Sequence, residues 1–345
     1  MTLTATVLIP THDHGPTLLR SVRSALAQTV PELEVFVIGD GVPDVTRKLM
    51  ADVTAADERV RFFDHPKGQR HGELYRHAAL QEARGEIVCY LCDDDLWLPG
   101  HVEHLRDLLR NSDFAHSLPF WIDPRGAIHP LRVDLSLPHF QTLFRGGENR
   151  IPLSCAGHTL ELYRRLPQGW RTTPDGIYTD LYMFQQILAV PGCRVAAGAK
   201  ATVINLPSPE RADWTLDERV AELDRYAARL AEPGFAAELT EGVVAATAAD
   251  AAELEAAYGE LEVAYGELAD ETRRTHAAAG ELETRLHETR ADKAKLDERA
   301  SRLGEELQTL SSSVTWRLRA RLLAIPGLAG FFRWAASALA GRAGR

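Results

Sequence analysis

The sequence predicts an α/β fold, a doubly wound and mostly parallel sheet with helices on both faces, followed by a long helical coiled coil. Short apolar runs alternate with amphipathic segments of helical period over roughly the first 112 residues. Polar residues stand where several of these runs end. From residue 246 the composition shifts to Ala, Glu, Leu and Arg, and no proline occurs between Pro233 and Pro326.

The first strands and helices alternate at the spacing of a parallel sheet. Strands are expected at short apolar runs bounded by turn residues, over 5–10, 33–41, 60–66 and 86–92. Helices are expected to begin near Pro16, Asp44, Gly72 and Pro99. Because parallel neighbours need a long crossover, usually a helix, this order favours a parallel sheet over an antiparallel one.

Residues 113–206 are less regular. Strand-like runs over 115–122, 127–133 and 194–206 surround a helical pattern at 179–190, and residues 211–232 have the period of an amphipathic helix. We expect a smaller mixed sheet laid against the first one. The predicted organisation is one compact α/β domain, a helical linker, a coiled coil and a basic amphipathic tail, over residues 1–210, 211–245, 246–312 and 313–345.

A seven-residue repeat predicts the coiled coil. Its first row, in order, is Leu254, Leu261, Leu268, Thr275, Leu282, Thr289, Leu296, Leu303 and Leu310. A second row, four residues further on, is Tyr258, Tyr265, Thr272, Ala279, Leu286, Lys293, Ala300 and Leu307. Two apolar rows at this spacing favour a homo-oligomer through the coiled coil, and the alternative is a single solvated helix.

The charges are distributed unevenly. A net charge of −10 disfavours nucleic acid as a partner. No acidic residue follows Glu306, whereas six arginines do: Arg317, Arg319, Arg321, Arg333, Arg342 and Arg345. Trp and Phe interleave with these arginines, which predicts a helix lying on an anionic membrane surface, with packing on the protein itself as the alternative. Pro326 and Arg333 interrupt the most apolar stretch, so no clear transmembrane helix is expected.

Two further features bear on the location. Four cysteines give a chain of 345 residues no disulfide framework, and the first residues lack the pattern of a signal peptide. The predicted location is cytoplasmic, with peripheral attachment to the inner face of the cell membrane through the tail.

Polar residues converge at the predicted carboxyl ends of three strands. Thr11, His12 and Asp13 follow the first strand, Asp40 ends the second, and residues 93–95 (three aspartates) follow the fourth. Ligands of open α/β sheets bind beyond these ends. Carboxylates there could hold Mn²⁺ or Mg²⁺, which can bridge the phosphates of a diphosphate and neutralise their charge.

These motifs resemble those of family 2 glycosyltransferases, which have the GT-A fold. VLIPTHDHGPTLLRSVRSALAQTVPELEVFVIGDG resembles the opening of such a domain, and GELYRHAALQEARGEIVCYLCDDDLWLPG resembles its arginine-containing helix, next strand and acidic motif. The resemblance covers residues 3–112 well and 150–205 weakly. It implies inverting, metal-dependent transfer of a sugar from a nucleotide-sugar donor to a glycan or lipid-linked acceptor, in bacterial surface-polysaccharide or glycoconjugate synthesis.

The resemblance also implies roles for particular residues. Asp40 would bind the base and ribose of the donor, and Arg76 its phosphates. Asp93 would contact donor ribose or sugar, and Asp94 the metal, with Asp95 as a further metal ligand. The loop that lines the nucleotide would comprise Pro10, Thr11, His12 and Asp13.

Two positions depart from the family pattern. Gly39 replaces a second aspartate, and Cys92 stands where the first acidic residue of the motif often lies. These departures leave the division of roles among the three aspartates open.

The resemblance places the general base at Asp180, in PDGIYTDLYMFQQIL, with Thr179 replacing the usual glutamate. The alternatives are that Asp180 only complements the helix dipole, or that Asp175 is the base. Two other functions stay open: a degenerate domain serving as a coiled-coil scaffold, and a nucleotidyltransferase. The latter would need a glycine-rich basic loop after the first strand, which PTHDHGPT is not.

Overall fold

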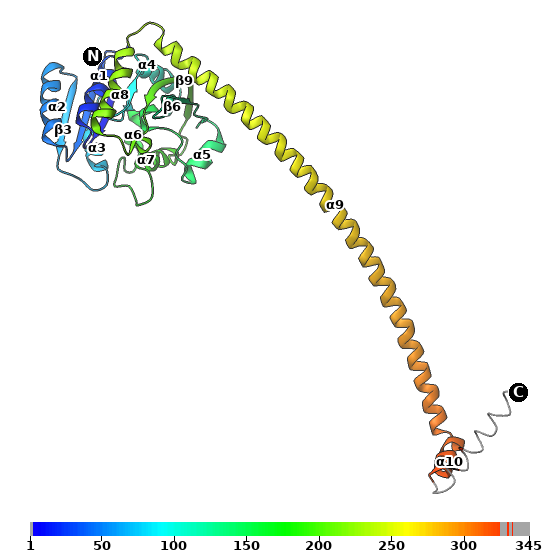
Figure 1. Ribbon diagram of the computed structural model, residues 1–345. Coiled ribbons are helices and arrows are strands. Elements are labelled where there is room, and N and C mark those ends of the chain that lie inside the picture. Colours follow the sequence, from blue (N-terminus) through cyan, green and yellow to red (C-terminus); the bar gives the residue numbers. More distant parts are fainter. Residues whose placement is uncertain (1–2, 325–329, 331–332, 334–345) are drawn as a thin grey trace. The chain divides into compact units, whose positions relative to one another are not determined.

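The computed structural model describes residues 3–324, 330 and 333 (Figure 1). The chain divides into two compact units, Met1–Glu255 and Ala256–Arg345. The first unit holds a sheet of nine strands, counted over the described residues. In chain order these are β1 (Leu3–Thr11), β2 (Leu33–Asp40), β3 (Val60–His65), β4 (Gly85–Tyr90), β5 (Leu96–Trp97), β6 (Phe114–Ile122), β7 (Ile128–His129), β8 (Ala156–Thr159) and β9 (Val195–Asn205).

The amino-terminal half of the sheet is parallel, as predicted. Its order is β3-β2-β1-β4, and Val7 of β1 pairs with Val35 on one side and Cys89 on the other. Every residue of β2 is buried, which is typical of a parallel strand covered on both faces. The predicted strands and the observed ones agree closely in this half.

The helices follow the strands as a doubly wound fold requires. They are α1 (Gly15–Leu26), α2 (Asp44–Ala56), α3 (Glu73–Leu80), α4 (His101–Leu109), α5 (Pro138–Arg145), α6 (Leu160–Arg165), α7 (Thr179–Leu188) and α8 (Leu216–Arg229). Crossovers between parallel strands are right-handed. Helices α1 and α2, which lead outward to β3, therefore share one face and contact each other, whereas α3 leads back to β4 on the other face. The predicted fold class, with helices on both faces, is confirmed.

The second half of the domain differs from the expectation of a separate smaller sheet. Strand β8 pairs antiparallel with both β4 and β6, so it joins the two halves into one sheet. Beyond it, β6 runs parallel to β9, and β5 pairs antiparallel with β9. The short strand β8 carries no sequence signal of its own, because four residues are too few to show a period.

Two helical features hold the carboxyl-terminal part of this unit together. A short 3-10 helix, Ser208–Arg211, is tied to α8 by the buried pair of Arg211 and Glu222, with Nε and Oε2 2.5 Å apart. Phe235 and Leu239, in the first turns of the next helix, are buried in a small core with Leu223 of α8. The first compact unit therefore extends past residue 210, and the predicted domain boundaries stay predictions.

The predicted coiled-coil segment lies within one helix, α9 (Phe235–Ser312), which Figure 1 shows as continuous. The leucines of both rows are exposed along it. Helix α10 (Val314–Leu323) follows, capped by Ser313. Of the predicted basic tail, residues 325–329, 331–332 and 334–345 lie outside the described part. Among the described residues, no helix combines the length and the apolarity needed to cross a membrane.

Candidate active site

One cavity brings together residues from the ends of four sheet strands and from helix α3. Its volume is about 430 Å³. It is lined by every predicted nucleotide-sugar residue and by one predicted metal ligand: Pro10, Thr11, His12, Asp13, Asp40, Arg76, Asp93 and Asp94. The strand ends thus bring these side chains around a common space, as the sequence predicted.

Asp40 connects three parts of the cavity wall through hydrogen bonds. Its Oδ1 accepts a hydrogen bond from the backbone N of Gly68 at 2.6 Å, and its Oδ2 accepts one from Lys67 Nζ at 2.6 Å. Its carbonyl oxygen lies 2.6 Å from Nδ1 of His12, which therefore carries the proton on that nitrogen. Gly72 has φ of +67°, and a Cβ there would lie 2.8 Å from the Asp40 carboxyl carbon. The glycine is required both by its backbone conformation and by the close approach of Asp40.

Arg76 is a buried cation in the cavity wall. Burial lowers the pKa of its guanidinium. One Nη donates to the carbonyl of His71 at 2.8 Å, and the guanidinium stacks over Trp170 at 4.9 Å from the ring centroid. Its Nε and the hydroxyl of Thr11 are both buried without a hydrogen-bond partner. Both residues line the cavity, so these two atoms are available to hydrogen-bond a ligand there.

Asp93 is held by a residue that the motif analysis did not single out, His14. Nδ1 of His14 lies 3.1 Å from Oδ1 of Asp93, and this hydrogen bond raises the pKa of His14 to about 9. On its other side, Nε2 of His14 lies 3.1 Å from Nη1 of Arg219. With a pKa of about 9 the ring is protonated at neutral pH, so this contact is an approach of two cations beside the aspartates and not a hydrogen bond. The ring therefore lies between the acidic motif and helix α8.

Asp94 is paired with Arg219 as well. Nη2 of Arg219 lies 2.6 Å from Oδ2 of Asp94 and 2.6 Å from the hydroxyl of Ser208, which itself donates to Asp94. Both charged side chains are 14% exposed. Burial and the neighbouring Asp93 raise the pKa of Asp94 even with this partner. The predicted metal ligand is thus already neutralised by a protein cation.

Asp95 faces a different set of partners. Its Oδ2 accepts from Ser154 Oγ at 2.5 Å, and Asn205 Nδ2 lies 3.0 and 3.1 Å from its two carboxyl oxygens. The backbone N of Leu206 also donates to Oδ1 at 3.2 Å. Burial, with Asp94 adding to it, raises the pKa of Asp95 to about 7. These bonds join the acidic motif to the end of β9.

Asp180 lies at the start of α7 and lines an adjoining cavity of about 770 Å³ together with Asp94 and Asp95. Its Oδ2 accepts from Asn149 Nδ2 at 2.9 Å, and its Oδ1 from its neighbour's backbone N, that of Leu181, at 2.8 Å. Burial raises its pKa. The alternative base, Asp175, is 95% exposed and pairs with Arg70.

Several site residues were missed by the sequence argument. They are His14, Lys67, Asn149, Ser154, Trp170, Asn205, Ser208 and Arg219. His14 follows directly on the predicted loop and could have been included. The others lie on segments with no motif, and Arg219 looks like any charged residue on an amphipathic helix.

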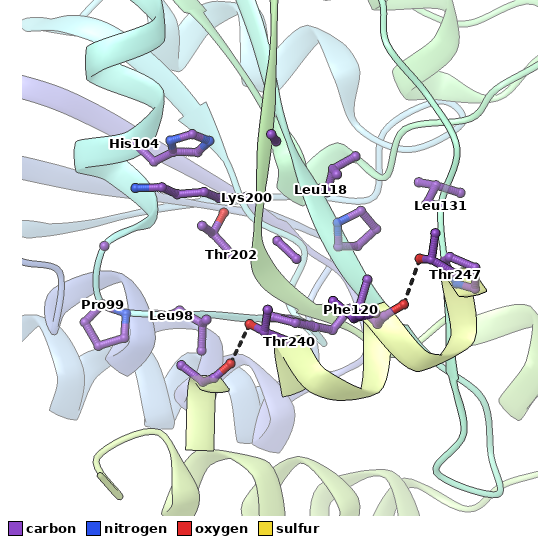
Figure 2. Close-up of a pocket in the computed structure, with 18 of the residues that line it drawn as sticks. Leu98, Pro99, His104, Leu118, Phe120, Leu131, Lys200, Thr202, Thr240 and Thr247 are labelled. Carbon is purple, nitrogen blue, oxygen red and sulfur yellow. Dashed lines mark hydrogen bonds between the residues drawn. The ribbon is translucent and has the colours of Figure 1, made fainter. Parts of the chain in front are cut away.

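A third cavity, of about 740 Å³, lies between α4, β6, β9 and the first turns of α9 (Figure 2). Most of the side chains that line it are apolar, including Leu118 and Phe120. The hydroxyls of Thr240 and Thr247 donate to carbonyls of their own helix, so they offer no free donor to a ligand. None of the predicted site residues lines this cavity.

Comparison with known proteins supports the motif analysis. A family model described as Glycosyl transferase family 2 matches residues 6–165. An uncharacterized glycosyltransferase of Nostoc sp. is 29% identical over 109 residues, which is 31% of this chain and 33% of the relative. The GalNAc(5)-diNAcBac-PP-undecaprenol beta-1,3-glucosyltransferase of Campylobacter jejuni is 27% identical over 110 residues, covering 32% of this chain and 35% of the relative.

A solved structure of S. aureus TarS 1-349 in complex with UDP-GlcNAc is 14% identical, with a TM-score of 0.49, and covers 71% of this chain and 72% of that one. Because the family model matches them, residues 6–165 are a family 2 glycosyltransferase domain, which confirms the predicted family. The chain spans about a third of the length of the two curated relatives named here. Asp180, Ser208 and Arg219 lie beyond the matched segment.

Proposed function

We propose that this chain transfers a sugar, with inversion, from a nucleotide-sugar donor to a glycan or lipid-linked acceptor. The observation that carries the proposal is the single cavity formed by the predicted nucleotide-sugar residues at the strand ends, which adjoins the cavity of Asp180. The matched family supports the reaction class. The relative from Campylobacter bears a name that includes an undecaprenol-linked glycan, which supports a lipid-linked acceptor in bacterial glycoconjugate synthesis.

The donor's nucleotide would lie over the ends of β1 and β2. Asp40 is the acceptor for base or ribose groups, and His12 is fixed beside it by a hydrogen bond through Nδ1. Arg76 would donate to the phosphates, because it is a buried cation with one nitrogen unpaired. A guanidinium held by stacking on Trp170 is already ordered, so little side-chain entropy is lost on binding.

A divalent cation would fit the acidic motif by displacing Arg219 from Asp94 and the proton from His14. Ligand atoms of His14, Asp93 and Asp94 lie within 4.8 Å of one another. Carboxylate oxygens are preferred by Mg²⁺ and Mn²⁺, which would supply charge neutralisation for the departing diphosphate. We assign the main metal role to Asp94, with Asp93 beside it.

The second group that satisfies the same distance comprises Cys92, Asp94 and Asp95. Burial raises the pKa of the Cys92 thiol, which disfavours the thiolate. Because both oxygens of Asp95 already accept hydrogen bonds, we propose that Asp95 supports the motif and contributes to the metal only secondarily.

Asp180 would take the proton from the acceptor hydroxyl as it attacks the anomeric carbon. Burial raises its pKa, which makes it a stronger base than an exposed aspartate. Asn149 and the Leu181 amide fix the carboxylate but leave further lone pairs to accept from a hydroxyl. The exposed, ion-paired Asp175 has neither advantage.

We further propose a cytoplasmic protein that self-associates through α9 and attaches peripherally to an anionic membrane through its basic tail. The exposed leucines of α9 support the first contact. Arg317, Arg319 and Arg321 on α10, a helix without acidic residues, support the second.

A panel of UDP-, GDP- and dTDP-sugars with Mn²⁺ tests the proposal. We expect turnover of at least one donor, lost on chelation and in Asp94→Asn. Asp180→Asn should bind the donor normally and lose transfer, whereas the matched variant Asp175→Asn should keep both. If no donor binds or turns over, the scaffold alternative stands in place of the enzyme.

A further inference from the structure

Helix α9 presents a long apolar face. Over residues 256–312 it belongs to the second compact unit, and the leucines of its repeat are strongly exposed, between 52% and 65% for the row that includes Leu261, Leu268 and Leu303. The row four residues further on adds Leu286 at 49% and Leu307 at 67%. An apolar stripe at a seven-residue spacing is complementary to another helix with the same spacing, and a second copy of this chain supplies one.

The charges that flank this stripe decide how two copies can be oriented. In a parallel pair, two kinds of flanking position face each other. A residue that directly precedes a member of the second row faces the residue numbered five higher in the partner, and that residue directly follows a member of the first row. That pairing sets Arg285 against Arg290, and Asp292 against Asp297. It also sets Lys293, a member of the second row, against its own copy in the core. Like charges therefore face each other at three successive places in the middle of a parallel pair, which disfavours this orientation.

An antiparallel pair replaces these like-charge contacts with contacts between opposite charges. In the register that sets Leu268 opposite Leu307, each Arg285 faces Asp292 of the other copy, and each Glu283 faces Arg290. By symmetry each attractive pair occurs twice.

The same register suits the core. Lys293 faces Leu282, whose neighbour Glu283 is acidic, and the apolar pairs include Tyr265 with Leu310. One pair, Glu271 with Glu306, is repulsive and lies toward the ends of the overlap.

The neighbouring antiparallel registers bring like charges together and are therefore less favourable. A shift of one heptad in one direction sets Arg285 against its own copy, and the opposite shift sets Arg285 against Arg299 and Glu283 against Asp297. Like charges at such flanking positions discriminate between registers and orientations.

We infer that two copies of this chain associate through an antiparallel coiled coil of residues 263–312, in the register that pairs Leu268 with Leu307. This inference rests on the self-association proposed above and specifies its orientation. It does not depend on the transferase activity, so the dimer tests and the sugar-transfer assay can fail separately. The chain would form a dimer, with the two carboxyl-terminal ends of α9 directed away from each other.

Cysteine cross-linking on the full chain tests the orientation. In the antiparallel register, Leu268→Cys and Leu307→Cys should form a disulfide-linked dimer when the two variants are mixed, and each variant alone should not. Two copies of residue 268 then lie roughly 60 Å apart along the helices, at a rise of about 1.5 Å per residue. The parent chain, whose own four cysteines include two buried ones, is the control. Self-linking of either single variant would show a parallel pair and overturn the inference.

A charge reversal gives an independent readout by sedimentation equilibrium. Arg285→Glu places like charges opposite Asp292, so we expect the dimer dissociation constant to rise roughly tenfold, given the size of such pair energies. The double variant R285E/D292R should restore the parent value. In a parallel pair Arg285→Glu would instead face Arg290 and tighten the dimer, which would refute the orientation. A parent chain that stays monomeric would refute the association itself.

Discussion

Removing the guanidinium of Arg219 should destabilise the cation-free protein and tighten its binding of Mn²⁺. Arg219 and Asp94 are 14% exposed, and their atoms approach to 2.6 Å. Loss of one partner of a buried ion pair lowers the free energy of unfolding by about 3–5 kcal/mol, because the other charge stays buried without a counter-charge. Two factors reduce this figure. Ser208 still donates to Asp94, and the pKa of Asp94 is already raised, so the carboxyl can take up a proton. We therefore expect Arg219→Ala to cost about 2–3 kcal/mol.

In a domain of this size, each kcal/mol lowers Tm by about 2–4 °C, so the loss should be roughly 4–12 °C. Mn²⁺ should restore much of the lost Tm, because in this variant Arg219 no longer competes with the cation for Asp94. Each tenfold tightening in Kd adds about 1.4 kcal/mol of stabilisation at a fixed excess of Mn²⁺.

The assay is thermal unfolding with and without MnCl₂, together with calorimetric titration of Mn²⁺. The matched control is Arg20→Ala. It breaks the partly exposed pair between Arg20 of α1 and Asp224 of α8, the helix that also carries Arg219, and should cost at most about 1 kcal/mol. Its response to Mn²⁺ should equal that of the parent. If Arg219→Ala binds Mn²⁺ no more tightly than the parent does, the idea that Arg219 occupies the cation's place is wrong.

Three further predictions address the rest of the site and the tail. Gly72→Ala should cost about 1–2 kcal/mol and weaken nucleotide binding, since its φ is +67° and its Cβ would displace Asp40, whereas Gly100→Ala, with open space around it, should bind normally in the same titration. Asn149→Ala removes a hydrogen bond that lowers the pKa of Asp180, so that pKa should rise and the acid limb of the kcat/KM profile should move to higher pH; a shift to lower pH would exclude Asp180 as the base. Deletion of residues 314–345 should abolish binding to anionic liposomes in a flotation assay, and undiminished binding would refute the interfacial role of the tail.

The sequence alone predicted the parts that depend on local pattern. Apolar runs bounded by turns located β1, β2, β3 and β4, and their parallel order followed from the helices between them. The ends of those strands then placed Thr11, Asp40 and Asp93 at one edge, because parallel strands that share a direction also share an end. The family followed from the same motifs.

What the pattern could not show is what reaches this edge from elsewhere in the chain. Helix α8, more than a hundred residues after the acidic motif, delivers Arg219 to Asp94, and the end of β9 delivers Asn205 to Asp95. Neither segment has a motif, because an arginine on a polar helix face and an asparagine at a strand end are ordinary residues until the chain folds.

The acidic motif shows the same division in a single stretch of three residues. Its position after a buried strand is fixed by local sequence, but the environment of each carboxylate is set by tertiary contacts. Asp93 meets His14, Asp94 meets Arg219, and Asp95 meets Asn205 and Ser154. Sequence therefore determined the fold class, the parallel half of the sheet, the family and where charge would gather. Only the tertiary structure decided which of these charges is already neutralised, because ion pairs and burial depend on residues far apart in the chain.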